Sequence, residues 1–322
     1  MPMVCKLMAV VALCVVPAVA IAQAYPTKTV RFISPYPPGG VTDIAARFTS
    51  VKLAEIWKQP VVVDNRTGGG GTVAMDAGAK AAPDGYTLLF ATVADLCIIP
   101  FGYAKLPYNI ARDFAGVVMV TETPLVWAAH RDAPFGSLRD LIAHSKATPG
   151  GISYGSPALG SLNHVVAEQF AQITGANLVH IPYKGGGPAG AALASGEIPL
   201  GMLAVSSVAP HTKSGRVKAL AVTSERRSVL GPEWPTIAEA GVAGISGAQW
   251  VAVMAPAGTP RAIIDKLNAD FNTVLKGVDI QERLAAVGAE PLGSTPETVA
   301  WRIQKSTEDY KPVLEKLKLK LD

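Results

Sequence analysis

The chain has few cysteines. Of the three in its 322 residues, Cys5 and Cys14 stand near the start, and Cys97 is the third. Beyond the first 14 positions Cys97 has no cysteine with which to form a disulfide or a zinc site. The sequence therefore excludes a small disulfide-stapled fold and predicts that stability comes from buried apolar surface.

The chain also lacks a strong excess of either charge. Its 29 lysine and arginine residues exceed the 25 acidic residues by four. Proteins that bind nucleic acid through its phosphates carry clustered positive charge. The most basic stretch, residues 311–320, mixes lysines with valine and leucine at helical spacing. We expect an amphipathic terminal helix there and no nucleic-acid partner.

A long apolar run stands near the beginning. Lys6 precedes the uncharged residues 7–16, and Ala22-Gln23-Ala24 follow. The run is shorter than the roughly 20 residues of a membrane span. A positive charge, a short apolar core and a small-x-small site are typical of a secretory signal. We predict a signal peptide over residues 1–24, with export of the mature chain to the periplasm.

Past residue 25, short runs rich in β-branched residues alternate with segments of helical period. The first are strands at 29–34, 61–64 and 87–92 and helices at 43–57 and 73–80. The later ones are strands at 117–121, 125–130, 152–155, 178–182, 198–205 and 251–255 and helices at 138–146, 162–174, 189–195 and 261–276. This alternation predicts an α/β fold with parallel strands, and the length suits two lobes.

Glycine, proline and hydroxyl residues follow several predicted strands. Pro35–Asp43 opens the first helix, Ser156–His164 enters a later one, and Tyr183-Lys184-Gly185 follows the strand at 178–182. Parallel strands end at one edge of a sheet, where helix N-termini present N–H groups to an anion. The segments predict a carboxylate site, although turns and helix caps alone also account for each of them.

Two glycine-rich segments resemble nucleotide loops. Residues 68–72 lack the Lys-Ser/Thr of a phosphate loop, and residues 185–190 match G-x-G-x-x-G without an acidic residue after the next strand. We expect no nucleotide and no other cofactor.

Catalytic and metal sites have weak support. Gly151–Gly155 matches the G-x-S-x-G elbow of serine hydrolases, but Pro149-Gly150 precedes it, so Ser153 is expected inside a strand. A hydrolase using Ser153 stays an alternative. His164 and Glu168 share a helical face, yet no further residue has metal-ligand spacing, so we expect no metal.

The chain resembles the Bug family, the periplasmic solute-binding receptors of tripartite tricarboxylate transporters. The resemblance covers nearly the whole mature chain and depends on ordered segments, namely 25–26 with 30–31, 35–43, 63–66, 83–89, 182–185, 216–223, 235–241 and 255–260. Each segment alone is weak, but their order is specific.

The resemblance implies a periplasmic-binding-protein type II fold, a Venus flytrap of two α/β lobes with two hinge crossings. Lobe 1 would comprise residues 25–123 and 247–322, and lobe 2 residues 124–246, with crossings near Thr123 and Ser246. The implied protein is a monomeric, non-catalytic receptor that passes a small carboxylate to the membrane subunits of a transporter. A sensor that signals to a kinase of a two-component system is the alternative.

The resemblance also implies which residues face the ligand. Backbone N–H groups would hold the carboxylate between the two lobes. Carried over to this chain, the site comprises Tyr36, Gly39, Gly40, Asp43, Thr92, Ser156, Ser161, His164 and Tyr183. Leu203-Ala204-Val205 stands where relatives often have a polar or acidic residue. A plain or aromatic carboxylate is therefore expected rather than an amino acid.

Overall fold

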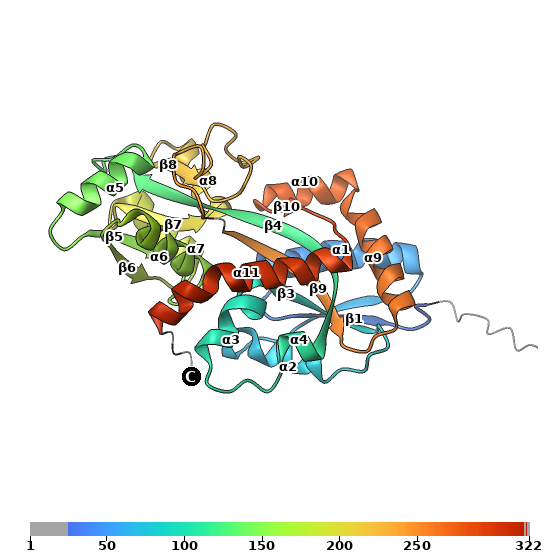
Figure 1. The fold of residues 1–322 in the computed structure, drawn as a ribbon. Helices are drawn as coiled ribbons and strands as arrows, with labels where there is room; N and C mark the ends of the chain where they lie inside the picture. Colours follow the sequence, from blue (N-terminus) through green and yellow to red (C-terminus); the bar gives the residue numbers. More distant parts are fainter. Residues whose placement is uncertain (1–24, 246, 319, 321–322) are drawn as a thin grey trace, which may run out of the picture.

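The computed structural model describes residues 25–245, 247–318 and 320. The predicted signal peptide and the predicted crossing at Ser246 lie outside these residues. Within the described ranges, no helix combines the length and the apolar character that a membrane span requires. The chain forms a mixed α/β structure around one curled sheet (Figure 1).

The first part of the chain builds one half of the sheet. Strands β1 (Val30–Ser34), β2 (Val61–Asn65) and β3 (Thr87–Thr92) lie parallel in the order β2-β1-β3. They alternate with α1 (Val41–Trp57), η1 (Gly69–Gly71) and α2 (Thr72–Ala79), and are followed by η2 (Ala94–Ile98), α3 (Ile99–Gly102) and α4 (Ile110–Asp113). The predicted strands and helices of this region are confirmed to within about two residues.

The middle of the chain builds the other half. Its helices and strands are α5 (Leu138–Ala147), β5 (Ile152–Ser156), α6 (Leu162–Thr174), β6 (Leu178–Pro182), α7 (Gly186–Ser195), β7 (Leu200–Ala204), α8 (Val205–Lys213) and β8 (Val217–Val222). Strand β5 pairs in parallel with β6 and β7. The carboxyl ends of these strands again lead into helices, as the alternation predicted.

One long strand, β4 (Phe114–His130), joins the two halves. Residues 114–124 pair with β9 (Ala248–Pro256), and residues 125–130 pair with β7 and β8. The prediction of two separate strands here was wrong. Pro124 stands at the end of one ladder, just before the next begins, where a residue without an N–H is tolerated. The lobe boundaries stay a prediction, and β4 changes partners next to the first of them.

The last part of the chain returns to the first half. It comprises β9, α9 (Arg261–Leu275), α10 (Val278–Ala286), β10 (Glu290–Pro291) and α11 (Pro296–Leu317). The predicted terminal helix begins 15 residues earlier than expected, at Pro296, because Thr295 caps it and Pro296 suits its first turn. Helix α11 lies along both halves and contacts β4 and α6 (Figure 1).

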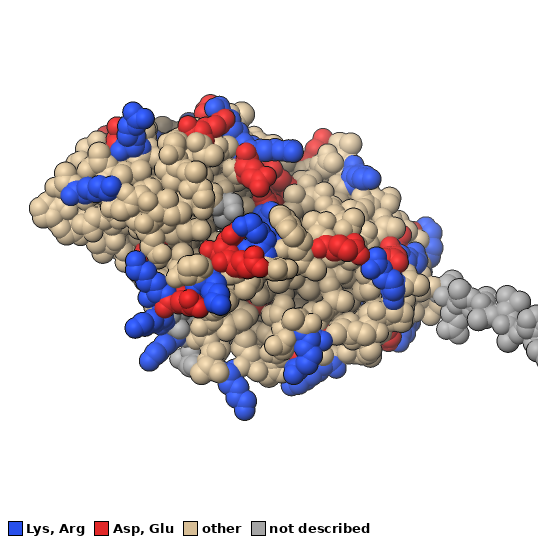
Figure 2. All heavy atoms as spheres, in the orientation of Figure 1, with Lys and Arg blue, Asp and Glu red and all other residues tan. Residues whose placement is uncertain are grey.

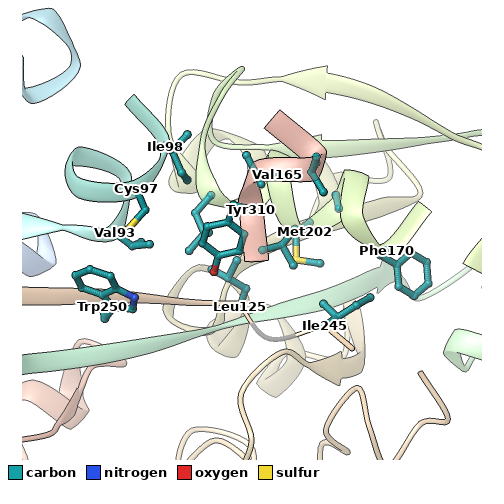
Figure 3. Packing of buried hydrophobic residues seen from close by; sticks show 14 of the residues in the cluster. Val93, Cys97, Ile98, Leu125, Val165, Phe170, Met202, Ile245, Trp250 and Tyr310 are labelled. Atoms are coloured by element: carbon teal, nitrogen blue, oxygen red, sulfur yellow. The ribbon is translucent and has the colours of Figure 1, made fainter. Parts of the chain in front are cut away.

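A continuous apolar cluster connects the halves. Figure 3 shows Tyr310 of α11 among Cys97 and Ile98 of the first half and Val165 and Met202 of the second. All five side chains are at most 5% exposed. Burying side chains of this size stabilises the fold by about 1.5–3 kcal/mol each. On the face drawn in Figure 2, acidic and basic side chains are interspersed, in keeping with the small net charge.

Candidate ligand-binding site

A cavity of about 870 Å³ lies between the two halves of the sheet. The first half and the returning segment contribute Tyr36, Gly39–Thr42, Ile44, Gly70, Val93, Ala94, Ile99, Tyr103, Gln249, Ala286 and Val287. The second half contributes Pro157–Asn163, Gly186, Gly187, Ala204, Ser206 and Ser207. Among these described lining residues there is no lysine, arginine, histidine, aspartate or glutamate.

Four helices begin at this cavity. The first residues of α1, α6 and α7 belong to its lining, as do the N-cap residue of α8, Ala204, and Ser206 and Ser207 in its first turn. In α6 the Ser161 hydroxyl accepts from the His164 N–H, whereas no side chain caps α1, α7 or α8. The unpaired N–H groups of a helix start carry about half a positive charge. The cavity therefore offers an anion several positive helix ends without a cationic side chain.

The predicted residue Asp43 holds the loop between β1 and α1 in place from the side away from the cavity. Its carboxylate is 2% exposed and accepts from the Gly39 N–H at 3.0 Å, from Arg47 Nε at 2.9 Å and from Asn65 Nδ2 at 2.8 Å. Burial acts to raise the pKa of Asp43, but these hydrogen bonds outweigh it and lower the pKa. An ionised Asp43 thus fixes the turn that places Gly39 and Gly40 at the cavity, without lining it.

Tyr36 lies in the cavity wall above two buried polar side chains. Its hydroxyl donates to Asp95 Oδ1 at 2.9 Å and lies 3.3 Å from the Thr92 hydroxyl oxygen. Thr92, the last residue of β3, is fully buried and donates to Asp95 Oδ2 through its N–H and its hydroxyl. The predicted residue Thr92 therefore supports Tyr36 from below.

Two predicted residues of the second half, Ser156 and His164, are also buried behind the wall. The Ser156 hydroxyl donates to the Ala158 carbonyl oxygen at 3.0 Å and lies 2.7 Å from His180 Nε2. The rings of His164 and His180 stack with centroids 4.0 Å apart, and the Gly160 N–H donates to His164 Nδ1 at 3.2 Å. These contacts hold the loop that carries Ser161 to the cavity.

Burial keeps both imidazoles neutral. It lowers the pKa of His164 to about 4, with His180 as a second cause, and it lowers the pKa of His180 to about 4. The Gly160 N–H requires an unprotonated His164 Nδ1, which agrees with a neutral ring. The two imidazoles behind the second half of the cleft are therefore uncharged at neutral pH.

The last predicted residue, Tyr183, also lies outside the lining. Its hydroxyl donates to Glu197 Oε1 at 2.8 Å, and its ring packs against Gly155, where a side chain would come within 3.1 Å of it. Of the nine predicted residues, the structure thus places Tyr36, Gly39, Gly40 and Ser161 on the cavity and the other five outside its lining.

The geometry gives little support to a hydrolase. Ser153 lies within β5, paired with Val179, and not on a strand-to-helix turn. Ser156 is close to a histidine, but it is fully buried and its proton is directed to a carbonyl oxygen. Among the residues that the structure describes, no group of three His, Cys, Asp or Glu side chains is placed to hold a metal.

Sequence reasoning missed Asp95 and the starts of α7 and α8. The helix predicted at 189–195 begins three residues earlier, at Gly186, and the strand predicted to reach Val205 ends at Ala204, because α8 begins at Val205. Gly186-Gly187 was therefore interpreted as a turn and Ser206-Ser207 as the end of a strand, and neither pair was predicted to begin a helix. The Gly-Gly-Pro run was a usable signal, since proline suits a first helical turn.

A second hollow, of about 920 Å³, lies between α11 and the α3–α4 region. Its lining is mainly apolar, and the two charged residues among the described lining are Glu308 and Lys311. No helix of eight or more residues begins among its lining residues in the described chain, so it lacks the anion-binding feature of the cavity between the halves.

Comparison with known proteins agrees with this geometry. Residues 45–319 match the family model described as "Tripartite tricarboxylate transporter family receptor". BugT of Bordetella pertussis is 40% identical over 281 residues, covering 86% of this chain and 85% of BugT.

Two solved structures from Rhodopseudomonas palustris are similar over their full length. Rpa4515, solved with adipate, is 33% identical with a TM-score of 0.78, covering 91% of this chain and 98% of that one. MatC, solved with malate, is 28% identical with a TM-score of 0.75, covering 90% and 100%. The chain therefore belongs to the TctC family of tripartite tricarboxylate transporter receptors, as the resemblance to Bug proteins predicted.

Proposed function

We propose that this chain is a monomeric, non-catalytic periplasmic receptor that captures a small carboxylate between its two lobes. The observation that carries the proposal is an uncharged cavity at which four helices begin. Each helix start stabilises an anion by about 0.3–1 kcal/mol when exposed, and by up to about 2 kcal/mol in a partly buried site. The adipate and malate bound by relatives are carboxylates of this kind.

The lining also favours ligands without an ammonium group. Ala204 is the N-cap residue of α8, in the segment 203–205 where the resemblance implies that relatives often have a polar or acidic residue, and no acidic side chain lines the described cavity. A buried ammonium without an anionic partner is costly. We therefore infer a plain or aromatic mono- or dicarboxylate as the ligand.

The proposed handover uses closure of the two lobes. Lobe 1 comprises residues 25–123 and 247–322, lobe 2 comprises residues 124–246, and β4 and β9 lie at the crossing. Closure excludes water and strengthens the contacts of the carboxylate with the helix ends. The closed form is then presented to the membrane subunits of a tripartite tricarboxylate transporter.

A thermal-unfolding screen of the chain from residue 25 onward tests this function. Each dicarboxylate and aromatic acid is paired with its neutral amide. A ligand at 100 times its dissociation constant adds about 2.7 kcal/mol of stability. We expect a rise in melting temperature with one acid class and none with the matching amides or with amino acids. Equal rises with acids and amides, or no rise with any acid, contradict the proposal.

A further inference from the structure

Asp95 is a buried carboxyl group in direct contact with the wall of the cavity. It is fully buried in η2 and accepts hydrogen bonds from the Tyr36 hydroxyl at 2.9 Å and from the Thr92 N–H and hydroxyl at 2.8 and 2.7 Å. Tyr36 itself lines the cavity. One tyrosine side chain therefore separates Asp95 from the proposed carboxylate.

The surroundings give the carboxyl group no cation. The titratable groups that face it are Tyr36 from the β1–α1 loop, Tyr108 from the segment before α4, and Cys97 from η2 itself. Gly71 lies directly against the carboxyl group, because a Cβ at this position would clash with Asp95 Oδ1. None of the ion pairs among the described residues includes Asp95.

Burial without a cation disfavours the charged form of Asp95. It raises the pKa of the carboxyl to about 6, against the lowering effect of the hydrogen bonds from Thr92 and Tyr36. A second negative charge brought into the cavity disfavours that form further, since like charges interact strongly where water is excluded.

The Tyr36 hydroxyl connects the two anions. When Asp95 is ionised, the Tyr36 hydroxyl donates its single proton to Asp95. The hydroxyl oxygen can then only accept hydrogen bonds from other groups. With Asp95 protonated, the acid can donate to Tyr36, and the tyrosine proton is then available to another acceptor, either the Thr92 hydroxyl at 3.3 Å or a carboxylate in the cavity. The protonated arrangement therefore suits a bound carboxylate.

We propose that Asp95 takes up one proton from the solvent when a carboxylate binds beside Tyr36, so that capture of the ligand is coupled to protonation. Asp95 then sets the affinity through Tyr36 and does not touch the ligand. The inference rests on the proposed function. By linkage, affinity rises as the pH falls, by at most about tenfold per pH unit.

Calorimetric titration at pH 7 in two buffers of different ionisation enthalpy measures the proton uptake directly. The probes are adipate and malate first, then whichever acid stabilises the protein most in the screen above. These acids stay ionised from pH 6.5 to 8, so their own titration does not contribute. We expect uptake of a substantial fraction of one proton and an affinity at least about threefold higher at pH 6.5 than at pH 8.

Asp95→Asn is the matched variant, because asparagine imitates the protonated acid in shape and carries no charge. It should bind the same acid without proton uptake and with an affinity that is constant between pH 6.5 and 8. If Asp95→Asn does not fold, Tyr36→Phe takes its place as the test. It removes the hydroxyl that connects Asp95 to the cavity wall and should reduce the proton uptake.

The outcomes separate the two proposals. Binding by the unmodified protein with no proton uptake overturns the role of Asp95 and leaves the receptor function intact. Proton uptake that persists in Asp95→Asn assigns it to another group and also overturns this role. Failure of every acid to bind overturns the proposed function and this inference together.

Discussion

The two walls of the cleft are supported by opposite kinds of titratable group. Behind the wall of the first half, besides the ionised Asp43 that is paired with Arg47, stands a carboxyl without a cation, Asp95; behind the wall of the second stand two imidazoles, His164 and His180. Burial raises the pKa of the acid to about 6 and lowers the pKa of each base to about 4. In both cases burial favours the neutral form, which leaves the backbone as the main source of positive potential at the cleft.

This difference gives the two walls opposite responses to pH. Asp95 has a folded-state pKa above its usual value, so its ionisation destabilises the fold above about pH 6, and this cost disappears as the pH falls toward 4. The histidines have folded-state pKa values below their usual value, so their stabilising contribution is lost as the pH falls from about 6.5 to 4.

A charge placed in the cleft itself should have the largest effect. Gly187 lines the cavity at the start of α7, and a side chain there meets open space. Gly187→Asp puts a carboxylate where the ligand carboxylate is expected. At about 5 Å and an effective dielectric constant of about 20, the repulsion is about 3 kcal/mol, or more than 100-fold in affinity.

Gly187→Asn is the control for that change, since it has the same shape and no charge. Isothermal titration with the best acid should show binding by Gly187→Asn within about tenfold of the unmodified protein. Equal affinities of the aspartate and asparagine variants would mean that the anion does not bind near α7.

Removing the charge behind the first wall should have the next largest effect. Asp95→Asn abolishes the cost of an ionised buried carboxyl, so we expect it to raise the free energy of unfolding by about 2–3 kcal/mol at pH 8. The gain should shrink toward zero at pH 4, where the native acid is neutral. Urea unfolding at both pH values measures it, and the exposed Asp265→Asn serves as the control. A gain that is independent of pH would contradict the buried-charge account.

Removing a neutral base behind the second wall should have a smaller effect of opposite sign. Between pH 7 and 5, the unfolded chain protonates His164 and the folded chain does not, which costs about 2 kcal/mol. His164→Asn keeps an oxygen that accepts from the Gly160 N–H and does not titrate. The loss of stability on acidification should be about 2 kcal/mol smaller in this variant, by urea unfolding, and an unchanged loss would refute the assignment.

The smallest effect is expected for Ser156→Ala. It removes the partner of His180 Nε2 and should lower the free energy of unfolding by about 1 kcal/mol, with little effect on affinity for the best acid. The unmodified protein, Ser156→Ala and Ser153→Ala should all hydrolyse nitrophenyl esters no faster than buffer alone. Ester turnover that disappears in either variant would restore the hydrolase interpretation.

The sequence predicted the fold better than the site. Strand and helix periodicity located β1, α6 and β6 closely, because each has a clear apolar pattern and a capping or turn residue at its ends. The periodicity did not predict β4 as one strand, because a proline such as Pro124 usually indicates the end of a strand. Here it lies inside a continuous strand, where the pairing changes from one ladder to the next.

The site was predicted at the level of loops rather than side chains. Tyr36, Gly39, Gly40 and Ser161 line the cavity, whereas Asp43 and Thr92 lie behind its wall. Motif spacing places a residue on a loop but does not tell which way its side chain points. The role of Asp95 depends on its distance from Tyr36, 59 residues away in the chain, which only the folded structure supplies.

A crystal structure of the protein with the acid that stabilises it most would locate the carboxylate directly. We expect the carboxylate within hydrogen-bond distance of backbone N–H groups at the starts of α1 and of at least one of α6, α7 and α8, with no lysine or arginine in contact. A carboxylate paired with a cationic side chain, or bound in the hollow beneath α11, would contradict this expectation.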